Sequence, residues 1–121
     1  VPMPWTSTGS SFGFGPGGAH LPQPAWFKDV NVEVQDKDGK STLNLYRNAL
    51  RIRRDLLCAE EIKWVKHPLA ADVLHFKRPN GWQCVTNFGT KPFKLPKGQI
   101  LLATKDVVDG KLPANATAWI K

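Results

Sequence analysis

Carboxylates are the most numerous candidates in this sequence for acid–base or nucleophilic chemistry. Such chemistry needs groups that are positioned beside a pocket. The ten carboxylates are Asp29, Glu33, Asp36, Asp38, Asp55, Glu60, Glu61, Asp72, Asp106 and Asp109. Most lie in turn-like or charged runs, where a solvated surface position is the default, and none follows a predicted strand beside an apolar pocket signature. We therefore predict no catalytic residue in this chain.

Histidine and cysteine could supply metal ligands or a nucleophile. His75 alternates with apolar neighbours in a predicted strand, so we interpret it as an outward-facing or a satisfied core histidine. Cys58 and Cys84 form no CxxC motif, and their spacing with His20 and His67 does not match a zinc site. No Gly-x-Ser-x-Gly motif is present, and neither cysteine has a nearby histidine. We therefore predict no metal, no cofactor, and two reduced thiols in a cytoplasmic protein.

One glycine-rich segment has the spacing of a dinucleotide fingerprint. Residues 13–18 read Gly-Phe-Gly-Pro-Gly-Gly, which fits GxGxxG. The fingerprint requires a strand before it and a helix after it. A Ser/Thr run precedes this segment and Ala19-His20-Leu21-Pro22 follows it, so we do not interpret it as a nucleotide site.

The charge balance is basic, with a formal net charge of +7 and a pI of about 9.7. The dense cluster Arg47, Arg51, Arg53 and Arg54 is followed at once by Asp55 and two further acids. That arrangement favours a solvated helix face over a phosphate-binding track, so no nucleic-acid partner is predicted. No apolar run approaches ~20 residues, so no membrane span is predicted. The opening Val1-Pro2-Met3-Pro4-Trp5, without a visible signal peptide, suits a piece of a longer protein.

The first part of the chain divides into a loop and a helix. Residues 1–40 are rich in Gly, Pro, Ser and Thr but carry interleaved aromatics, which predicts a long irregular loop that packs on something. Residues 41–58 lack Pro and Gly and predict a helix with Ser41 as its N-cap. This helix has two apolar stripes, which is typical of a helix wedged between two bodies. The stripes are Leu45/Ala49/Ile52/Leu56 and Leu43/Tyr46/Leu50/Leu57.

Residues 61–121 read as short strands separated by turns at intervals of ~10 residues, a pattern typical of an antiparallel β-sandwich. The segment Arg78-Pro79-Asn80-Gly81 predicts a hairpin turn. We therefore expect a mainly β fold, with an antiparallel β-sandwich preceded by one long helix and an irregular loop. The predicted strands are 62–65, 73–77, 82–86, 93–95, 100–103 and 117–120.

An ordered set of short segments is the most specific signal. They are Val1-Pro2-Met3-Pro4-Trp5, Gly13-Phe14, Leu21-Pro22-Gln23-Pro24-Ala25-Trp26, Asn31-Val32-Glu33-Val34-Gln35 and Leu45-Tyr46-Arg47-Asn48-Ala49-Leu50. Their order resembles the α-glucosidase and oligo-1,6-glucosidase branch of glycoside hydrolase family 13, the α-amylase family. The ending with Leu112-Pro113, Ala116 and Trp119 also resembles the last strand of those enzymes. One departure is His20, where the family usually has a Trp.

The resemblance implies a parent enzyme with a catalytic (β/α)8 barrel. Residues 1–40 would then be the loop after the eighth barrel strand and 41–58 the eighth barrel helix, which together are a remnant of the barrel. Residues 61–121 would be the C-terminal β-domain. It also implies retaining hydrolysis of α-glucosides, with an Asp nucleophile and a Glu acid–base upstream of this segment. The expected partner is the barrel of the same protein, and the isolated chain is expected to be inactive.

Two alternatives remain open from the residues alone. A carbohydrate-binding module would use tryptophans as stacking platforms, although core packing is the commoner role of aromatic residues in strands. The candidates are Trp5, Trp26, Trp64, Trp82 and Trp119, the last three in strand-like segments. A basic nucleic-acid-binding domain is the other alternative. We further expect the isolated chain to self-associate through its helix, or to fold residues 1–40 over it.

Overall fold

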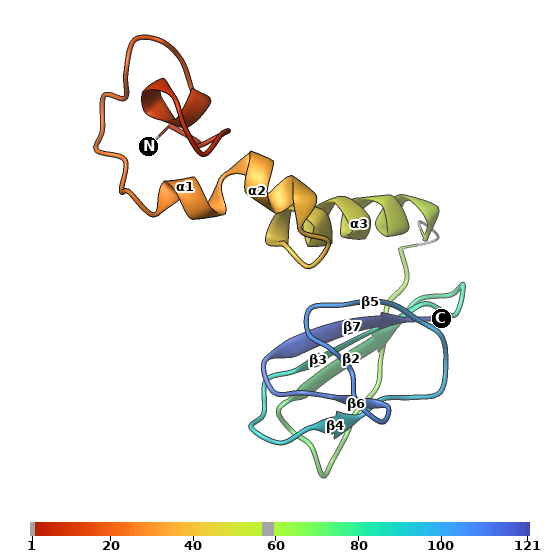
Figure 1. Ribbon diagram of the computed structural model, residues 1–121. Helices are drawn as coiled ribbons and strands as arrows, with labels where there is room; N and C mark the ends of the chain where they lie inside the picture. The colour runs from red at the N-terminus through yellow and green to blue at the C-terminus, as the bar shows by residue number, and fades with distance from the viewer. Residues whose placement is uncertain (1, 57–59) are drawn as a thin grey trace. The chain divides into compact units, whose positions relative to one another are not determined.

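The chain divides into two units in a computed structural model that describes residues 2–56 and 60–121 (Figure 1). The first unit, Val1–Asn48, holds short helices and loops. The second unit, Ala49–Lys121, is built around antiparallel strands. The predicted fold class, an antiparallel β-domain preceded by a helix, is confirmed.

Short strand-like segments, of which some alternate only partly between apolar and polar residues, build the main sheet of the second unit. Its central hairpin joins β2 to β3 through the predicted turn at 78–81, where Arg78 N–H donates to Trp82 O at 2.7 Å. Gly81 closes this turn with φ of 84°, a conformation that glycine adopts without a Cβ clash. All pairings in the sheet are antiparallel, and the strand order is β1-β2-β3-β7-β5. The strands are β1 (Lys63–Trp64), β2 (Val73–Lys77), β3 (Gln83–Asn87), β7 (Ala116–Ile120) and β5 (Ile100–Ala103).

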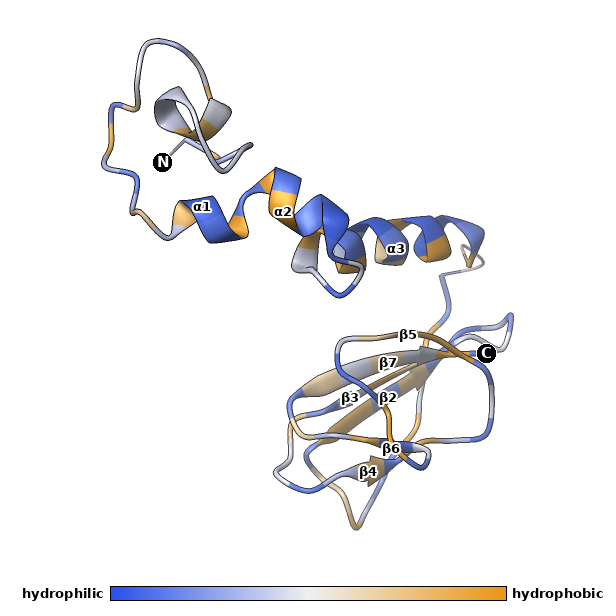
Figure 2. Ribbon diagram, in the orientation of Figure 1, coloured by the Kyte–Doolittle hydropathy of each residue, from blue (hydrophilic) through white to orange (hydrophobic). Residues whose placement is uncertain are grey.

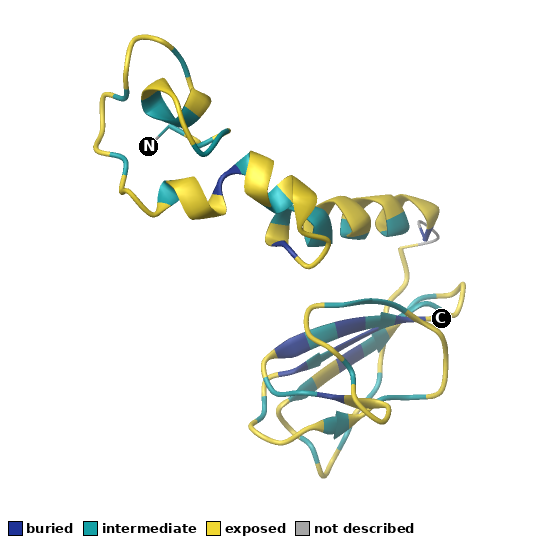
Figure 3. Cartoon of the chain, in the orientation of Figure 1, coloured by how far each residue is buried: buried dark blue, intermediate teal, exposed yellow. Residues whose placement is uncertain are grey.

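The hydrophobic core lies on one face of this sheet, between it and a smaller two-stranded sheet. That second sheet pairs β4 (Phe93–Lys94) with β6 (Lys111–Leu112). On the main sheet, Val85 of β3 is opposite Ala118 of β7, and neither is exposed to solvent. Figure 3 shows the buried positions along β3 and β7 in dark blue. The core residues are Val85, Leu112, Ala116, Ala118 and Ile120.

One close approach fixes the connection into β5. Gly98 has φ of 152°, and a Cβ at this position would lie 2.6 Å from Ile120 Cγ2 and 2.9 Å from Lys121 O. The backbone of this turn therefore lies against the end of β7, and only glycine fits there without a shift of the chain.

The first unit contains more helix than its composition predicted. Residues 1–40 were expected to be irregular, but they include the turn η1 (Ser10–Gly13) and the helices α1 (Phe27–Val30) and α2 (Val32–Lys37). Residues 25–37 contain neither Gly nor Pro, and the Asn31 side chain caps α2 by accepting from Val34 N–H at 3.1 Å. An Asx cap of this kind satisfies an amide that the first helical turn leaves free.

The long helix α3 spans Thr42–Asp55, and the predicted N-cap is confirmed because Ser41 Oγ accepts from Asn44 N–H at 3.2 Å. The predicted end at residue 58 lies outside the described residues, as does Leu57 of the second stripe. Figure 2 shows apolar and polar residues alternating around α3. The first stripe is half-buried and ends in buried Leu56, whereas Tyr46 and Leu50 of the second are 66% and 61% exposed.

Several sequence-based expectations differ from the structure in detail. The strand expected at 62–65 is reduced to β1, and Trp82 precedes β3 instead of lying within it. Strand β6 was not predicted, because two residues of strand carry no alternation signal of their own. Among the described residues, no helix has the length and apolar character that crossing a membrane requires.

Candidate functional site

His75 is the titratable group that the fold buries most completely in the second unit, with 3% of its surface exposed. It lies on the inner side of β2. Its Nδ1 lies 2.9 Å from His67 Nε2, and its Nε2 lies 3.0 Å from Gln83 Oε1 on β3. Of the two interpretations of His75, the satisfied core histidine is confirmed and the outward-facing one is wrong. Burial lowers the pKa of His75, the hydrogen bond with Gln83 acts in the opposite direction, and the nearby His67 and Lys77 lower the pKa further.

His67 connects this pair to the smaller sheet. Its ring lies nearly parallel to that of His75 and meets it edge to edge, with centroids 5.2 Å apart and planes 5° apart. The ring of Phe93 in β4 meets His67 edge-on, with centroids 4.9 Å apart. His67 therefore bridges a strand of the main sheet and a strand of the small sheet. Sequence reasoning did not pair these histidines, since only the path of residues 65–72 brings them together.

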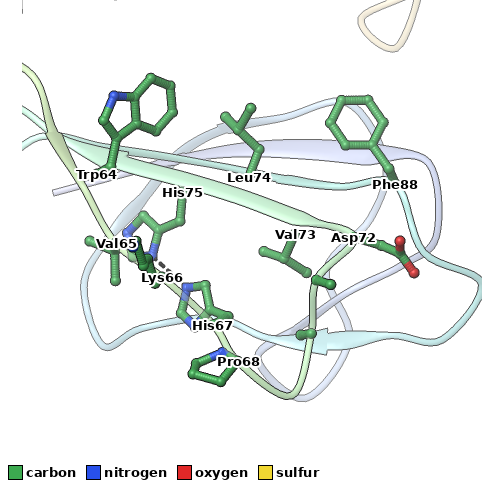
Figure 4. A pocket seen from close by; sticks show the side chains of 12 residues that line it. Trp64, Val65, Lys66, His67, Pro68, Asp72, Val73, Leu74, His75 and Phe88 are labelled. Atoms are coloured by element: carbon green, nitrogen blue, oxygen red, sulfur yellow. Dashed lines mark hydrogen bonds between the residues drawn. The ribbon is translucent and has the colours of Figure 1, made fainter.

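A groove lies along the outer edge of β2 beside this pair. Figure 4 shows Trp64, Leu74 and Phe88 on one side of the strand, with His67 and His75 on the other. Trp64, Leu74 and Phe88 are 60%, 40% and 64% exposed, so this side of the sheet is apolar and open to solvent. The groove can accept an apolar or aromatic surface, because its wall offers broad hydrophobic area and few charged groups.

Four aromatic rings form a ladder on the main sheet. Trp64 meets Phe76 with centroids 5.7 Å apart, Phe76 meets Trp82 at 5.5 Å, and Trp82 meets Trp119 at 5.3 Å. The interplanar angles of 73°, 75° and 89° are edge-to-face geometry, which stabilises aromatic pairs beyond their area burial. Trp82 and Trp119 are half-buried by this packing, whereas the expectation of core packing is wrong for Trp64.

Three of the four carboxylates of the first unit are engaged in local surface contacts. Glu33 Oε1 accepts from Lys37 Nζ at 3.1 Å, Asp36 pairs with Arg47, and Asp38 Oδ1 accepts from Lys40 N–H at 2.9 Å. The hydrogen bond from Lys37 and its charge hold the pKa of Glu33 below its ordinary value. A general acid needs the opposite shift, so this side chain is not suited to proton donation at neutral pH. Arg47 of the basic cluster is bound to Asp36 on the same surface.

The remaining candidate ligands are not assembled into a site in the described parts of the chain. Within residues 2–56 and 60–121, no three His, Cys, Asp or Glu side chains are grouped to hold a metal ion. Cys84 is a buried free thiol whose pKa is raised by burial, and Cys58 lies outside the described residues. The segment 13–18 follows a 3-10 turn and not a strand, so it lacks the setting of a dinucleotide fingerprint.

A second apolar groove lies within the first unit, and sequence reasoning did not predict it. It is lined mainly by Met3, Pro4, Val30, Val32, Leu43 and Tyr46. Its shape is fixed by backbone contacts: Val32 N–H donates to Pro4 O at 3.2 Å and Glu33 N–H donates to Trp5 O at 2.9 Å. The signal was available, since the segments 1–5, 31–35 and 45–50 that carry the family resemblance each contribute a wall residue.

Hydrogen bonds from two asparagine side chains also hold the segments around this groove. Asn31 Nδ2 donates to Lys28 O at 2.6 Å and to Ser7 Oγ at 3.1 Å. Asn44 Nδ2 contacts the carbonyls of Gln35, Asp36 and Asp38 at 3.0, 3.1 and 2.9 Å. These bonds tie α2 to the start of α3, so the loop is ordered although it has little apolar packing of its own.

Comparison with known proteins finds the same fold in part of larger enzymes. A trehalulose synthase from Pseudomonas mesoacidophila matches with a TM-score of 0.74 and 22% identity over 97% of this chain. An isomaltulose synthase from Klebsiella sp. matches with a TM-score of 0.77 and 19% identity over 99% of it. A trehalose-6-phosphate hydrolase from Bacillus licheniformis matches with a TM-score of 0.72 and 17% identity over 100% of it.

These matches cover nearly all of this chain but only part of each enzyme. This chain spans only 24%, 24% and 26% of the three enzymes. No family model matches the sequence, and no curated protein sequence does so either. At identities of this size, the likeness establishes the fold of the chain.

Proposed function

We propose that this chain is the C-terminal part of a glycoside hydrolase family 13 enzyme, whose parent hydrolyses α-glucosides with retention. The observation that carries the proposal is a match over nearly the whole chain to about a quarter of each similar enzyme. The ordered segments from Val1-Pro2-Met3-Pro4-Trp5 to Leu45-Tyr46-Arg47-Asn48-Ala49-Leu50 support the same family independently. The finer branch, α-glucosidase or oligo-1,6-glucosidase, rests on those segments alone.

In this proposal the three parts of the chain have distinct roles in the parent. Residues 1–40 are the loop after the eighth barrel strand, residues 41–58 the eighth barrel helix, and residues 61–121 the C-terminal domain. The apolar groove of the first unit supports this assignment, because Met3 and Tyr46 at its rim are 48% and 66% exposed. The exposed Trp64, Leu74 and Phe88 of the second unit support it too. Apolar patches of this kind seldom stay uncovered in soluble proteins.

The role of this chain is then structural, and catalysis belongs to the upstream barrel. Retaining glycosidases use two carboxyl groups ~5–5.5 Å apart, one as nucleophile and one as acid–base. Glu33, Asp36 and Asp38 instead form contacts with Lys37, Arg47 and Lys40 at the surface. Those contacts favour the fixing of loop and helix geometry over proton transfer. We place the parent enzyme in the cytoplasm, in keeping with the two cysteines of this chain, which do not make a disulfide framework.

The test is to read the coding sequence upstream of residue 1 and to express both the longer protein and the 121-residue chain. We expect the longer protein to contain a (β/α)8 barrel and to hydrolyse an aryl α-glucoside, and the short chain to release no product above buffer. Replacing the upstream nucleophilic Asp with Asn should abolish turnover in the longer protein. An upstream sequence without a barrel, or turnover by the short chain that survives repurification, would contradict the proposal.

A carbohydrate-binding role is the second candidate, and the exposure of Trp64 favours it. An indole with 60% of its surface exposed can stack on a sugar ring. Trp64→Ala, compared with Trp119→Phe inside the ladder, distinguishes the two. If sugar binding by the isolated chain is detectable and is lost only in Trp64→Ala, the module is favoured. If the chain binds no maltose at millimolar concentrations, the module is excluded.

A further inference from the structure

The geometry around His67 points to a conformational device: we propose that the His67–His75 pair is a pH-sensitive clasp that holds the 65–72 loop onto both sheets and releases it when both rings are protonated. The inference does not depend on the activity of the parent enzyme, because it concerns only residues of the second unit.

The hydrogen-bond partners fix the protonation state of the closed clasp. Gln83 Oε1 is an acceptor, so His75 Nε2, 3.0 Å away, must carry a hydrogen. In a neutral ring His75 Nδ1 is then an acceptor, and His67 Nε2 must donate to it across 2.9 Å. With both rings neutral, this arrangement therefore has the hydrogen of each ring on Nε2.

The two rings respond differently to a proton. A proton on His67 Nδ1 leaves its Nε2–H free to donate, so the clasp survives the first protonation. When both rings are protonated, His75 Nδ1–H and His67 Nε2–H set two donors against each other at 2.9 Å, so double protonation breaks the clasp.

Among the described residues, no negatively charged side chain is a hydrogen-bond or charge partner of His75. On β3 it faces the uncharged Gln83 and Val85, and on β4 the neighbouring ring is Phe93. Along β2, Lys77 adds positive charge. Lys66 and Asp72 line the groove beside it, and Asp72 is exposed.

Backbone hydrogen bonds hold the loop at its two ends, where Asp72 O also accepts from Phe88 N–H at 2.9 Å, and the clasp holds its middle. Val65 N–H donates to His75 O at 2.9 Å at one end of the loop, and Val73 N–H donates to Ala70 O at 3.0 Å at the other. Between them, the His67 ring is held by His75 and Phe93. The tip residue Leu69 is fully exposed, at 103%. Release of His67 would therefore free the loop that lines both the groove along β2 and the adjoining groove toward β4.

The direction of the effect follows from linkage. Burial lowers the pKa of His75 in the closed state, so the open state binds a proton more readily. Closure is therefore fully present above the ordinary histidine pKa of about 6.5 and weakens as the pH falls below it. For one additional proton, the open population rises up to about tenfold between roughly pH 7.5 and 5.5.

The test is amide hydrogen exchange of Val65, Ala70 and Val73 in the 121-residue chain, corrected for the intrinsic pH dependence of exchange, with ring-nitrogen NMR of the histidines. We expect the corrected opening of these amides to increase severalfold, up to about tenfold, over that pH interval. We expect the Val85 amide to change much less. The ring spectra should show both histidines with the hydrogen on Nε2 at neutral pH.

Two substitutions separate the clasp from a merely structural histidine. In His67→Gln the amide can rotate to offer either its N–H or its oxygen to His75 Nδ1, so the loop should stay closed at both pH values. His20→Gln makes the same change at an exposed histidine of the first unit and should leave the pH response of the loop intact. Opening of the loop that is independent of pH, or equally dependent on pH in His67→Gln, would overturn the proposal.

Discussion

Each of the two units of this chain is stabilised internally by a different kind of interaction. In the first unit, the buried residues among those the structure describes are Asn31 and Ser41, and both are polar. In the second unit the central residues are apolar, with Val85, Leu112 and Ile120 fully buried. The first unit is thus shaped by hydrogen bonds from amide and hydroxyl side chains to backbone groups, and the second by a hydrophobic core.

This difference indicates which of the two units can fold independently. Hydrophobic burial is the dominant favourable term in folding, whereas a typical hydrogen bond contributes only ~0.5–1.5 kcal/mol net. The second unit therefore carries most of its own stability. The first unit has an ordered backbone but leaves Trp26, Tyr46 and Met3 exposed. Exposed apolar side chains of this kind are typical of a surface that packs against another protein surface.

The largest effect expected is on the core of the second unit. Leu112→Ala removes a fully buried side chain that packs between the two sheets, and we expect it to lower the free energy of unfolding by about 2–5 kcal/mol. Chemical denaturation followed by the near-ultraviolet signal of the Trp82–Trp119 pair measures this change. Leu69→Ala is the control, because Leu69 is fully exposed and its removal should change little. Equal effects of the two would show that the core is not where the structure places it.

The strands of the second unit were predictable where the sequence itself contains a periodic signal. Residues 73–77 and 83–87 are strand-like with partial alternation and flank a Pro-Asn-Gly turn, so the hairpin β2–β3 follows from the local sequence. Ser41 was likewise predictable as a cap because its partner is three residues away.

What the sequence did not predict depends on contacts between distant segments. Strand β6 exists because β4 pairs with it, about eighteen residues away along the chain. The His67 ring lies against Phe93 of the small sheet, which is distant from it in the sequence. The groove of the first unit needs Pro4 beside Val32, which only the folded loop brings about. Periodicity reports on neighbours in sequence, and these contacts have no period.

The next prediction compares the same substitution in the two units. Asn87 is 1% exposed, and its Nδ2 donates to the carbonyls of Lys91, Leu112 and Pro113, at 2.9, 3.2 and 3.1 Å. Asn87→Ala removes this donor from the buried carbonyl of Leu112 and from the part-buried carbonyls of Lys91 and Pro113, and it should lower the global stability of the second unit by ~1–3 kcal/mol. Denaturation with urea, followed by circular dichroism, gives the value.

Asn31→Ala removes an equally buried amide from the first unit and should act locally. We expect faster hydrogen exchange at Val32 and Glu33, whose amides hold the groove, with the urea midpoint of the second unit unchanged. If Asn31→Ala lowers that midpoint as much as Asn87→Ala does, the two units unfold together and the contrast between them is wrong.

A smaller effect is expected on association of the isolated chain. Leu50 is 61% exposed on the second stripe of α3, and covering such a side chain stabilises an association by up to ~1.5–3 kcal/mol. We expect light scattering to show self-association at high concentration that Leu50→Lys reduces. Ile52→Lys, on the half-buried stripe, should instead destabilise the fold. A chain that stays monomeric at every concentration, with residues 1–40 fully mobile by NMR, would contradict the expectation.

The smallest effect belongs to the exposed pair Glu33–Lys37 on α2, which tests how little a surface charge pair contributes to the first unit. The hydrogen bond and charge of Lys37 lower the pKa of Glu33 from its ordinary value of 4.5. A carboxyl with a lowered pKa gives stability that is present above pH 4.5 and is lost as the pH falls through the pKa of the folded state. At neutral pH we therefore expect Lys37→Gln to leave the exchange of Val32 and Glu33 amides almost unchanged, since exposed pairs are screened by water and salt. Titration of the Glu33 carboxyl by NMR is the sensitive measurement, and its pKa should rise toward the ordinary value in the variant. If the pKa does not move, the low value comes instead from the backbone hydrogen bond with Ser7, and the anchoring of Glu33 belongs to the loop and not to its helix.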